Sequence, residues 1–346
     1  MEIRQDIFSK TPEGYDIEKF TLSNDNGLTA SVTNFGAILN SLRSPDRSGR
    51  FDEVTLGFDT LERYIWDTWF FGATIGRYAN RIERGRFILD GVEYQLPQNS
   101  PPSHLHGGHK GFHKVIWQPK KQVNRDSVSV FFSYLSVDGE EGYPGNLSVK
   151  VSYILNNQNE LTIAYQAKTD KVTPINLTNH TYWNLKGLTS GNVLDHVLTI
   201  NADYYLPTDD DRIPTGELKS VHGTPMDFTQ PIKIGTRIEQ VKEGGYNHCY
   251  VLRKQGHPLS LAATVHEPLT GRMMEIYTTE PGMQFYSGHF LDNYRGAHGI
   301  LLQKYHGFCL EAQHFPNSVN QPNFPSTILR PGEVYRQTTV QKFSAK

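Results

Sequence analysis

The chain has little of what marks several large classes of protein. Its 346 residues include 2 cysteines, too few for a disulfide-stapled scaffold, so a reducing compartment is the default expectation. The 34 Lys and Arg residues are balanced by 36 Asp and Glu residues, and this balance argues against a protein that binds nucleic acid or a membrane surface. There is no run of about 18 apolar residues, and the first segment lacks the apolar stretch of a signal peptide. We therefore expect a globular cytoplasmic protein.

Helical periodicity is also scarce, and alternation of apolar with polar residues takes its place. In Leu147–Leu155 the odd positions are apolar and most even positions are polar, which is typical of a half-buried strand. An Asp-Gly pair at Asp90 and Gly91 separates two short apolar runs and predicts a hairpin. Only Thr60–Trp69 and Ile234–Lys242 could form short helices. Further stretches that alternate in the same way are Ser127–Val137, Leu161–Ala167, Val193–Ile200, Leu259–Val265, Met274–Thr279, Phe308–His314 and Val334–Phe343.

Many short strands separated by Gly, Pro and Asn predict an all-β sandwich. Length alone would suggest about two domains, but all-β folds can run well beyond the usual domain size. The composition shifts nowhere along the chain, so we expect residues 1–346 to form one large domain. The 18 Phe, 18 Tyr and 4 Trp residues can supply its core and line a binding cleft.

Two polar clusters interrupt the alternation in the first third of the chain. Around Asn80, the residues Arg77 and Arg81 could clamp hydroxyl groups with their rigid guanidinium forks, although a solvated basic loop is the simpler interpretation. Further on, His104 and His106 are spaced so that a strand would place both imidazoles on one side, as in some metal sites. The carboxylate ligand that such a site needs is missing from the following residues, so histidines in a surface loop are an equal alternative.

Two more clusters lie in the second half. His180 is surrounded by Asn, Tyr and Trp, a mixture that suits sugars, because amides bind hydroxyls and aromatic faces cover the apolar C–H patches. Glu311 follows Phe308 and Leu310 on a predicted strand. At the inner edge of an apolar strand a carboxylate loses its water, which raises its pKa and makes it a better base. A core histidine and a solvent-facing glutamate are the alternatives.

In their order and spacing these clusters resemble the aldose 1-epimerase (galactose mutarotase) family from about Gly36 to Tyr335. The matching segments are Gly76–Ile82 (GRYANRI), Leu105–Gly108 (LHGG), Asp138–Gly145 (DGEEGYPG), Asn176–Leu185 (NLTNHTYWNL), Tyr204–Pro207 (YYLP), Gly282–Phe290 (GMQFYSGHF), Leu310–Asn317 (LEAQHFPN) and Leu329–Gly332 (LRPG). The resemblance implies a single large antiparallel β-sandwich, the galactose mutarotase-like supersandwich, with few short helices. It also implies an enzyme that interconverts the α and β anomers of hexoses such as galactose and glucose with no cofactor and no metal.

The resemblance also implies roles for individual residues. Glu311 matches the general base of the family and His180 matches the general acid. The positions that hold the sugar hydroxyls or the ring oxygen are matched by Asn80, Arg81, His106 and Gln284. Asn247 departs from the pattern: it stands in Gly-Tyr-Asn-His where many members have Gly-x-Asp-His, so we expect a substrate contact that keeps the shape of the aspartate without its charge.

The chemistry of mutarotation fits this set, since ring opening needs one base, one acid and several positioning donors. Burial is expected to raise the pKa of Glu311, and the pKa of His180 is expected to stay near its ordinary value. We therefore expect a bell-shaped pH dependence of turnover.

Three alternatives remain open from the sequence. A sugar-binding protein on the same fold would not need the acid and base, and a glycoside hydrolase would need a second carboxylate. Asp138, Glu140 and Glu141 fit a turn between strands better than that role. A phosphorylated hexose would need extra cations, for which Arg77, Arg81 and Lys110 are the candidates. We expect a small-molecule hexose as the partner, and a monomer or weak dimer.

Overall fold

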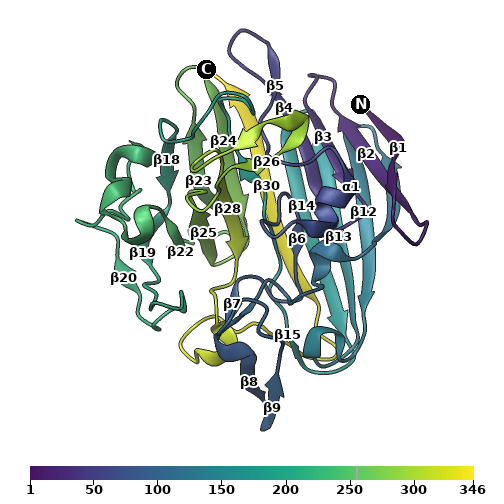
Figure 1. Cartoon of the computed structure of the whole chain (residues 1–346), viewed down its shortest axis with the longest axis vertical. Coiled ribbons are helices and arrows are strands. Elements are labelled where there is room, and N and C mark those ends of the chain that lie inside the picture. Colours follow the sequence, from purple (N-terminus) through teal and green to yellow (C-terminus); the bar gives the residue numbers. More distant parts are fainter. Residues whose placement is uncertain (255) are drawn as a thin grey trace.

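The computed structural model describes residues 1–254 and 256–346, and antiparallel strand pairs dominate it (Figure 1). The largest sheet has nine strands, in the order β11-β12-β13-β14-β30-β24-β23-β18-β21. The alternation predicted for Leu147–Leu155 is confirmed, since β13 buries Leu147, Val149, Val151, Tyr153 and Leu155. The strands of this sheet are β11 (Gln118–Val123), β12 (Ser127–Ser136), β13 (Leu147–Asn156), β14 (Glu160–Thr169), β30 (Tyr335–Ala345), β24 (Arg272–Thr278), β23 (Ser260–His266), β18 (Val197–Ile200) and β21 (Ile232–Lys233).

Two smaller sheets cover this sheet. A hydrophobic cluster joins all three, from Phe20 and Leu22 through Val130 and Val151 to Phe285. In Figure 1 the five-stranded sheet lies on the side of the N-terminus and the six-stranded sheet on the other side of β30. The five-stranded sheet contains β1 (Glu2–Lys10), β2 (Asp16–Ser23), β3 (Thr29–Thr33), β4 (Leu39–Pro45) and β5 (Phe51–Glu53). The six-stranded sheet has, in spatial order, β17 (Tyr182–Trp183), β28 (Phe308–Gln313), β25 (Gly282–Tyr286), β22 (Asn247–Leu252), β19 (Ala202–Tyr205) and β20 (Lys219–Ser220). The all-β sandwich is therefore confirmed.

Helices are few, as predicted. The first expected helix shortens to α1 (Leu61–Trp66), and the second is a 3₁₀ helix, η4 (Ile234–Gln240). None of the described helices is long and apolar enough to cross a membrane. The remaining 3₁₀ turns are η1 (Glu83–Gly85), η2 (Phe112–Lys114), η3 (Glu140–Gly142), η5 (Lys242–Gly244), η6 (Ala297–Gly299) and η7 (Ser318–Asn320).

The alternation did not reveal the five-stranded sheet. In β2 the buried residues are Ile17, Phe20 and Leu22, a spacing that breaks the period of two, and β1 leaves most of its side chains exposed or half-buried. β1 lies at the edge of the sheet, and its weak pattern follows from that position, since an edge strand has less of its surface packed on the core.

Short ladders outside the three sheets hold the segments that carry the predicted site. Arg81 lies in β7, which pairs with β10, and the segment before His180 forms β16, which pairs with β6. The predicted Asp-Gly hairpin is present as β8 and β9. The bounds are β6 (Thr74–Ile75), β7 (Arg81–Ile82), β8 (Arg86–Leu89), β9 (Val92–Gln95), β10 (His104–Leu105), β15 (Thr173–Pro174), β16 (Thr178–Asn179), β26 (Tyr294–Arg295), β27 (Leu301–Leu302) and β29 (Ile328–Leu329).

Candidate active site

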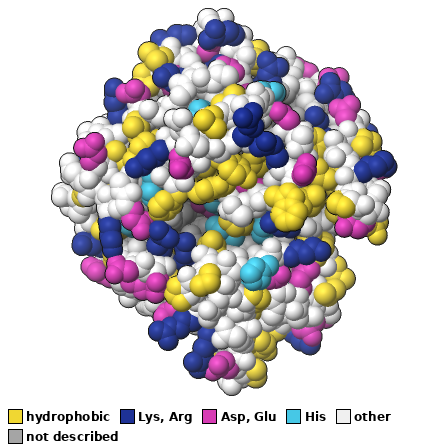
Figure 2. Space-filling view, in the orientation of Figure 1, with side chains coloured by type: hydrophobic (Ala, Val, Ile, Leu, Met, Phe, Trp, Pro, Cys, Tyr) yellow, Lys and Arg dark blue, Asp and Glu magenta, His cyan; other side chains and the backbone are white. Residues whose placement is uncertain are grey.

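A cavity of about 140 Å³ brings most of the predicted site residues together. Figure 2 shows a hollow near the middle of one face, with histidine side chains in and around it and hydrophobic and cationic side chains nearby. Six of the seven residues named from the sequence line the cavity: Asn80, Arg81, His106, His180, Asn247 and Glu311.

Glu311 projects from β28, every residue of which is buried. The side chain is 2 % exposed, and its Oε2 has no hydrogen-bond partner among the described residues. Burial raises the pKa of Glu311 to about 8, and the positive charge of Arg81 opposes this only in part. The desolvated carboxylate expected from the strand pattern is therefore present, with one oxygen free for a ligand.

His180 lies between β16 and β17, where its backbone is bonded on both sides. Its N–H donates to Ala73 O at 2.9 Å, and its carbonyl accepts from the Gly72 N–H at 3.0 Å. The imidazole Nε2 is 3.7 Å from Glu311 Oε1. Burial lowers the pKa of His180 to about 4, so the expected near-ordinary value is wrong, because the ring is nearly sealed from water. Burial thus opposes charge on both groups, and together they hold one proton at neutral pH.

His106 and Asn80 are joined by two hydrogen bonds, one to the His106 imidazole and one between their backbones. The Asn80 N–H donates to His106 Nδ1 and the His106 N–H donates to Asn80 O, both at 3.1 Å. Both residues are in the left-handed region, with φ of 61° at Asn80 and 51° at His106. Such non-glycine residues are uncommon and concentrate at binding sites. Because a backbone N–H can only donate, the neutral His106 ring carries its hydrogen on Nε2 and offers it as a donor.

His106, His180 and Glu311 offer one ligand atom each within 4.8 Å of one another, a spacing at which a metal could also be held. The hydrogen bonding of His106 does not fit that use. With Nδ1 engaged as an acceptor, Nε2 bears the hydrogen and has no lone pair for a metal. A ligating histidine usually donates its second N–H to a carboxylate or carbonyl, which is the opposite arrangement.

His104 has a different role from His106. Its Nδ1 lies 2.7 Å from Pro97 O and its Nε2 lies 2.7 Å from the Tyr143 hydroxyl, so both ring nitrogens are used inside the core. The expectation of two imidazoles on one side is wrong, because the left-handed backbone at His106 turns the chain after the short strand β10.

Gln284 does not line this cavity but supports its wall. It is the neighbour of Glu311 in the pairing of β25 with β28, and its Nε2 donates to Asn247 Oδ1 at 2.7 Å. With that oxygen engaged, the Asn247 amide nitrogen remains free to donate. Gln284 lines a neighbouring cavity, which shares Asn80, Arg81, Arg212 and Asn247 with the first.

Of the two arginines in the first cluster, only Arg81 faces the cavity. Its guanidinium has no acceptor among the described residues, and burial together with Arg212 lowers its pKa to about 10. Arg77 is 2 % exposed and donates to Pro144 O and Gly145 O at 2.9 Å, so the clamp proposed for it is wrong.

The acidic turn Asp138–Gly145 is structural, as expected. Glu141 accepts from the backbone N–H groups of His109 and Lys110, both at 3.0 Å, and so braces the loop that follows His106. Gly108 suits this turn because its φ of 103° favours glycine, and a Cβ would also lie 2.0 Å from the Glu141 carboxylate.

The sequence interpretation missed most of the aromatic wall and one cation. The Phe70 ring centre is 4.7 Å from that of His106 and 5.7 Å from that of His180. Arg212 also lines the cavity, paired with Glu243 at 2.9 Å. Nothing in the acidic run around Arg212 or beside Phe70 indicated a ligand site. The other missed aromatic residues are Trp69, Tyr182, Tyr286 and Phe290, the last three of which lie in segments that carry the resemblance.

Comparison with known proteins supports the family resemblance. The family model described as aldose 1-epimerase matches residues 18–342, a wider span than the motifs. Galactose mutarotase from Homo sapiens is 46 % identical over 342 residues, covering 98 % of this chain and 97 % of that protein. Aldose 1-epimerase from Escherichia coli K12 is 39 % identical over 341 residues, 97 % of each.

Solved structures agree in fold. An aldose epimerase homologue from C. elegans superposes with a TM-score of 0.88 at 32 % identity, over 94 % of this chain and 98 % of that one. A galactose 1-epimerase from Lactobacillus acidophilus superposes with a TM-score of 0.86 at 28 % identity, over 99 % of each. In sequence and in fold, this chain belongs to the aldose 1-epimerase family.

Proposed function

We propose that this protein interconverts the α and β anomers of free hexoses such as galactose and glucose, with Glu311 as general base and His180 as general acid. The observation that carries the proposal is the pair itself. A carboxylate and an imidazole lie 3.7 Å apart in a cavity of about 140 Å³, and both are buried. The membership of the family supports an enzyme of this kind.

The active form of the pair has the carboxylate ionised and the imidazole protonated. Glu311 takes the proton of the anomeric hydroxyl while His180 Nε2 gives its proton to the ring oxygen, so the C1–O5 bond breaks and the C1 carbonyl forms. Rotation about C1–C2 presents the other carbonyl face. The same two transfers in reverse close the ring, and the pair returns to its starting protonation. Proton transfers of this kind contribute about 10²–10⁴-fold each and call for no redox cofactor.

The rest of the cavity positions a neutral sugar. His106 Nε2–H, the Arg81 guanidinium and the Asn247 amide offer donors to hydroxyl oxygens. Phe70 and its aromatic neighbours offer apolar faces to the C–H side of the ring. Gln284 acts through Asn247, whose amide it holds.

The two other enzymatic candidates are less well supported. Glu311 is the only carboxylate among the described residues that line the cavity, whereas a glycoside hydrolase works with two. For a phosphorylated hexose, Arg77 is engaged in the core, Lys110 does not line the cavity, and Arg212 is neutralised by Glu243. Of these four cations, Arg81 is the one that both lines the cavity and has no ion-pair partner among the described residues.

Polarimetry tests the proposal directly. Fresh α-D-galactose or α-D-glucose is followed with and without protein, and we expect the optical rotation to relax faster with it. Relaxation at the buffer rate, together with sugar binding by calorimetry, would establish a binding protein instead. Glucose 6-phosphate is the matched substrate for the phosphorylated alternative, and we expect it to relax more slowly than glucose.

We also infer that residues 1–346 form one domain, because a single hydrophobic cluster takes members from all three sheets. A monomer or weak dimer remains a prediction for sedimentation measurements.

A further inference from the structure

Cys309 contacts the proposed general acid at the ring nitrogen that does not face Glu311. It lies two residues before Glu311 on β28, so the alternation of the strand puts both side chains on the same face. Its sulfur is 3.6 Å from His180 Nδ1, and Glu311 Oε1 is 3.7 Å from His180 Nε2. One strand therefore contacts both ring nitrogens of the same histidine. Cys309 is completely buried.

We propose that Cys309 is a positioning residue of the reaction: its sulfur accepts the Nδ1–H of His180, directs Nε2 toward Glu311 and the sugar, and, as a weak acceptor, leaves the imidazolium a strong acid. This inference rests on the proposed function.

The two proton transfers require that the hydrogen on His180 Nδ1 stays in place. When Nε2 gives its proton to the ring oxygen, the ring becomes the neutral tautomer with hydrogen on Nδ1 and a bare Nε2. That bare nitrogen takes the proton back when the ring closes. Nδ1–H stays bonded to the sulfur throughout, and the thiol keeps its own hydrogen. A partner that only donated to Nδ1 would favour the other neutral tautomer, as the Asn80 N–H does for His106.

Sulfur suits this task because it is a poorer acceptor than oxygen. A carboxylate on Nδ1–H would stabilise the imidazolium and weaken it as an acid. Burial raises the pKa of the Cys309 thiol well above its ordinary value, so no thiolate forms beside the ring. The geometric contrast is His314, whose Nδ1 lies 2.6 Å from the Glu280 carboxylate, away from the cavity.

The groups that face His180 come from several elements. Glu311 and Cys309 belong to β28, and Tyr182, whose ring centre is 5.2 Å from the imidazole, belongs to β17. The His106 ring centre is 5.3 Å away, and the His113 ring centre is 4.8 Å from that of Phe70. Burial lowers the pKa of both neighbouring histidines, to about 3 at His113, so both are neutral near pH 7. Cys309 can therefore be tested without a competing charge from these rings.

The test compares Cys309→Ser and Cys309→Ala with Cys249→Ser, a matched change at the other buried cysteine, on β22. Turnover of galactose is measured by polarimetry across pH, with kcat and KM separated. In Cys309→Ser the acidic limb of the pH–turnover profile should move to higher pH by about half a unit, because a hydroxyl accepts the Nδ1–H more strongly than sulfur does. In Cys309→Ala the limb should move down by a similar amount and kcat should fall about threefold to tenfold, with KM little changed. Cys249→Ser should leave the acidic limb in place.

Acidic limbs that coincide in the parent and in both folded Cys309 variants would overturn the proposal. If Cys309→Ala does not fold, the shift in Cys309→Ser decides alone. The ¹⁵N chemical shifts of His180 give a second readout, since the Nδ1–H tautomer should weaken in Cys309→Ala. A parent protein without mutarotase activity would refute the proposed function, and these shifts would still test the contact.

Discussion

Two glutamate–histidine pairs lie at β28, and their contrast separates the pair that we propose for the chemistry from a pair that holds the fold. At the end of the strand, Glu280 Oε2 and His314 Nδ1 are 2.6 Å apart. Within the strand, Glu311 Oε1 is 3.7 Å from His180 Nε2 and its other oxygen has no partner among the described residues. The first pair, the tight pair, is hydrogen-bonded and does not line the site cavity. The second, the loose pair, is too far apart for a hydrogen bond, and both of its side chains line the cavity.

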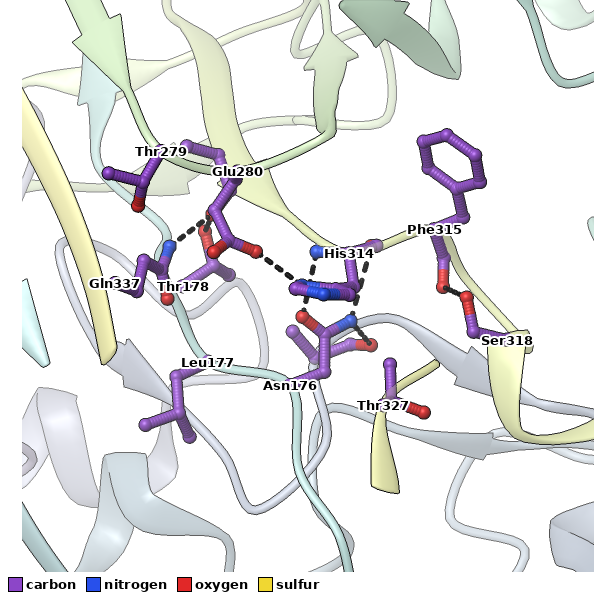
Figure 3. A network of polar contacts seen from close by, with 12 residues as sticks. Asn176, Leu177, Thr178, Thr279, Glu280, His314, Phe315, Ser318, Thr327 and Gln337 are labelled. Atoms are coloured by element: carbon purple, nitrogen blue, oxygen red, sulfur yellow. Dashed lines mark hydrogen bonds and ion pairs between the residues drawn. The ribbon is translucent and has the colours of Figure 1, made fainter. Parts of the chain in front are cut away.

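Figure 3 shows the hydrogen bonds around Glu280 and His314. Asn176 Oδ1 accepts the His314 N–H at 3.0 Å, and its Nδ2 donates to His314 O at 3.2 Å. The same Nδ2 is 3.3 Å from Ala79 O, next to Asn80. The network thus ties the end of the Glu311 strand to the segment of His180 and to the Asn80 loop. A buried polar group whose hydrogen bonds are all made fixes the local geometry of the fold. A buried polar group that lacks hydrogen-bond partners is available to a substrate.

The largest expected effect separates the two pairs by activity. Glu311→Gln should lower turnover at least about 100-fold, because the amide cannot take the anomeric proton. The matched change Glu280→Gln should leave kcat within a few-fold of the parent. Polarimetry on galactose measures both, and near-parent activity in Glu311→Gln would remove that residue from the mechanism.

The pH profile tests the loose pair as a unit. Burial raises the pKa of Glu311 to about 8 and lowers that of His180 to about 4, so the singly protonated pair predominates between these values. We expect kcat/KM to be highest there and to fall about tenfold per pH unit beyond each limb. A single limb, or a maximum outside this window, would contradict the shared proton.

Stability should respond to the same two substitutions with opposite signs. The folded protein keeps Glu311 protonated up to about pH 8, whereas the unfolded chain releases that proton near the ordinary value of 4.5. The folded state therefore binds more protons across this window and loses stability as pH rises through it. Glu311→Gln should raise the urea midpoint at pH 8 and flatten its pH dependence.

Glu280→Gln should lower the free energy of unfolding by about 1–3 kcal/mol, because it weakens a buried, charge-assisted hydrogen bond. Urea unfolding at pH 5 and pH 8 gives both comparisons. Equal shifts in the two variants would mean that the pairs do not differ in the way proposed.

The smallest expected effect concerns the cavity wall. In Asn247→Asp the Gln284 Nε2–H can still donate to an oxygen, but the free amide donor becomes an acceptor. We expect KM for galactose and glucose to change a few-fold, unequally, with kcat less affected. An unchanged KM on both sugars would mean that Asn247 does not contact the substrate.

The sequence was informative wherever one element acts alone. Alternation in Leu147–Leu155 predicted β13, and the apolar neighbours of Glu311 predicted its burial and raised pKa. It failed where the signal lies in packing between distant segments. Arg77 and Arg81 are four residues apart and equally basic in sequence, yet one is bonded within the core and the other faces the cavity. Arg212 and Phe70 were missed for the same reason.

By itself, then, the sequence determined the β architecture, the family motifs and the residue types that the chemistry needs, since these depend on local periodicity and composition. Only the tertiary structure decided which nitrogen of His180 lies near Glu311, which lies near Cys309, and that Gln284 donates to Asn247. Those contacts join residues far apart in the chain. The packing of the six-stranded sheet against its connecting segments sets their distances, and no local preference encodes them.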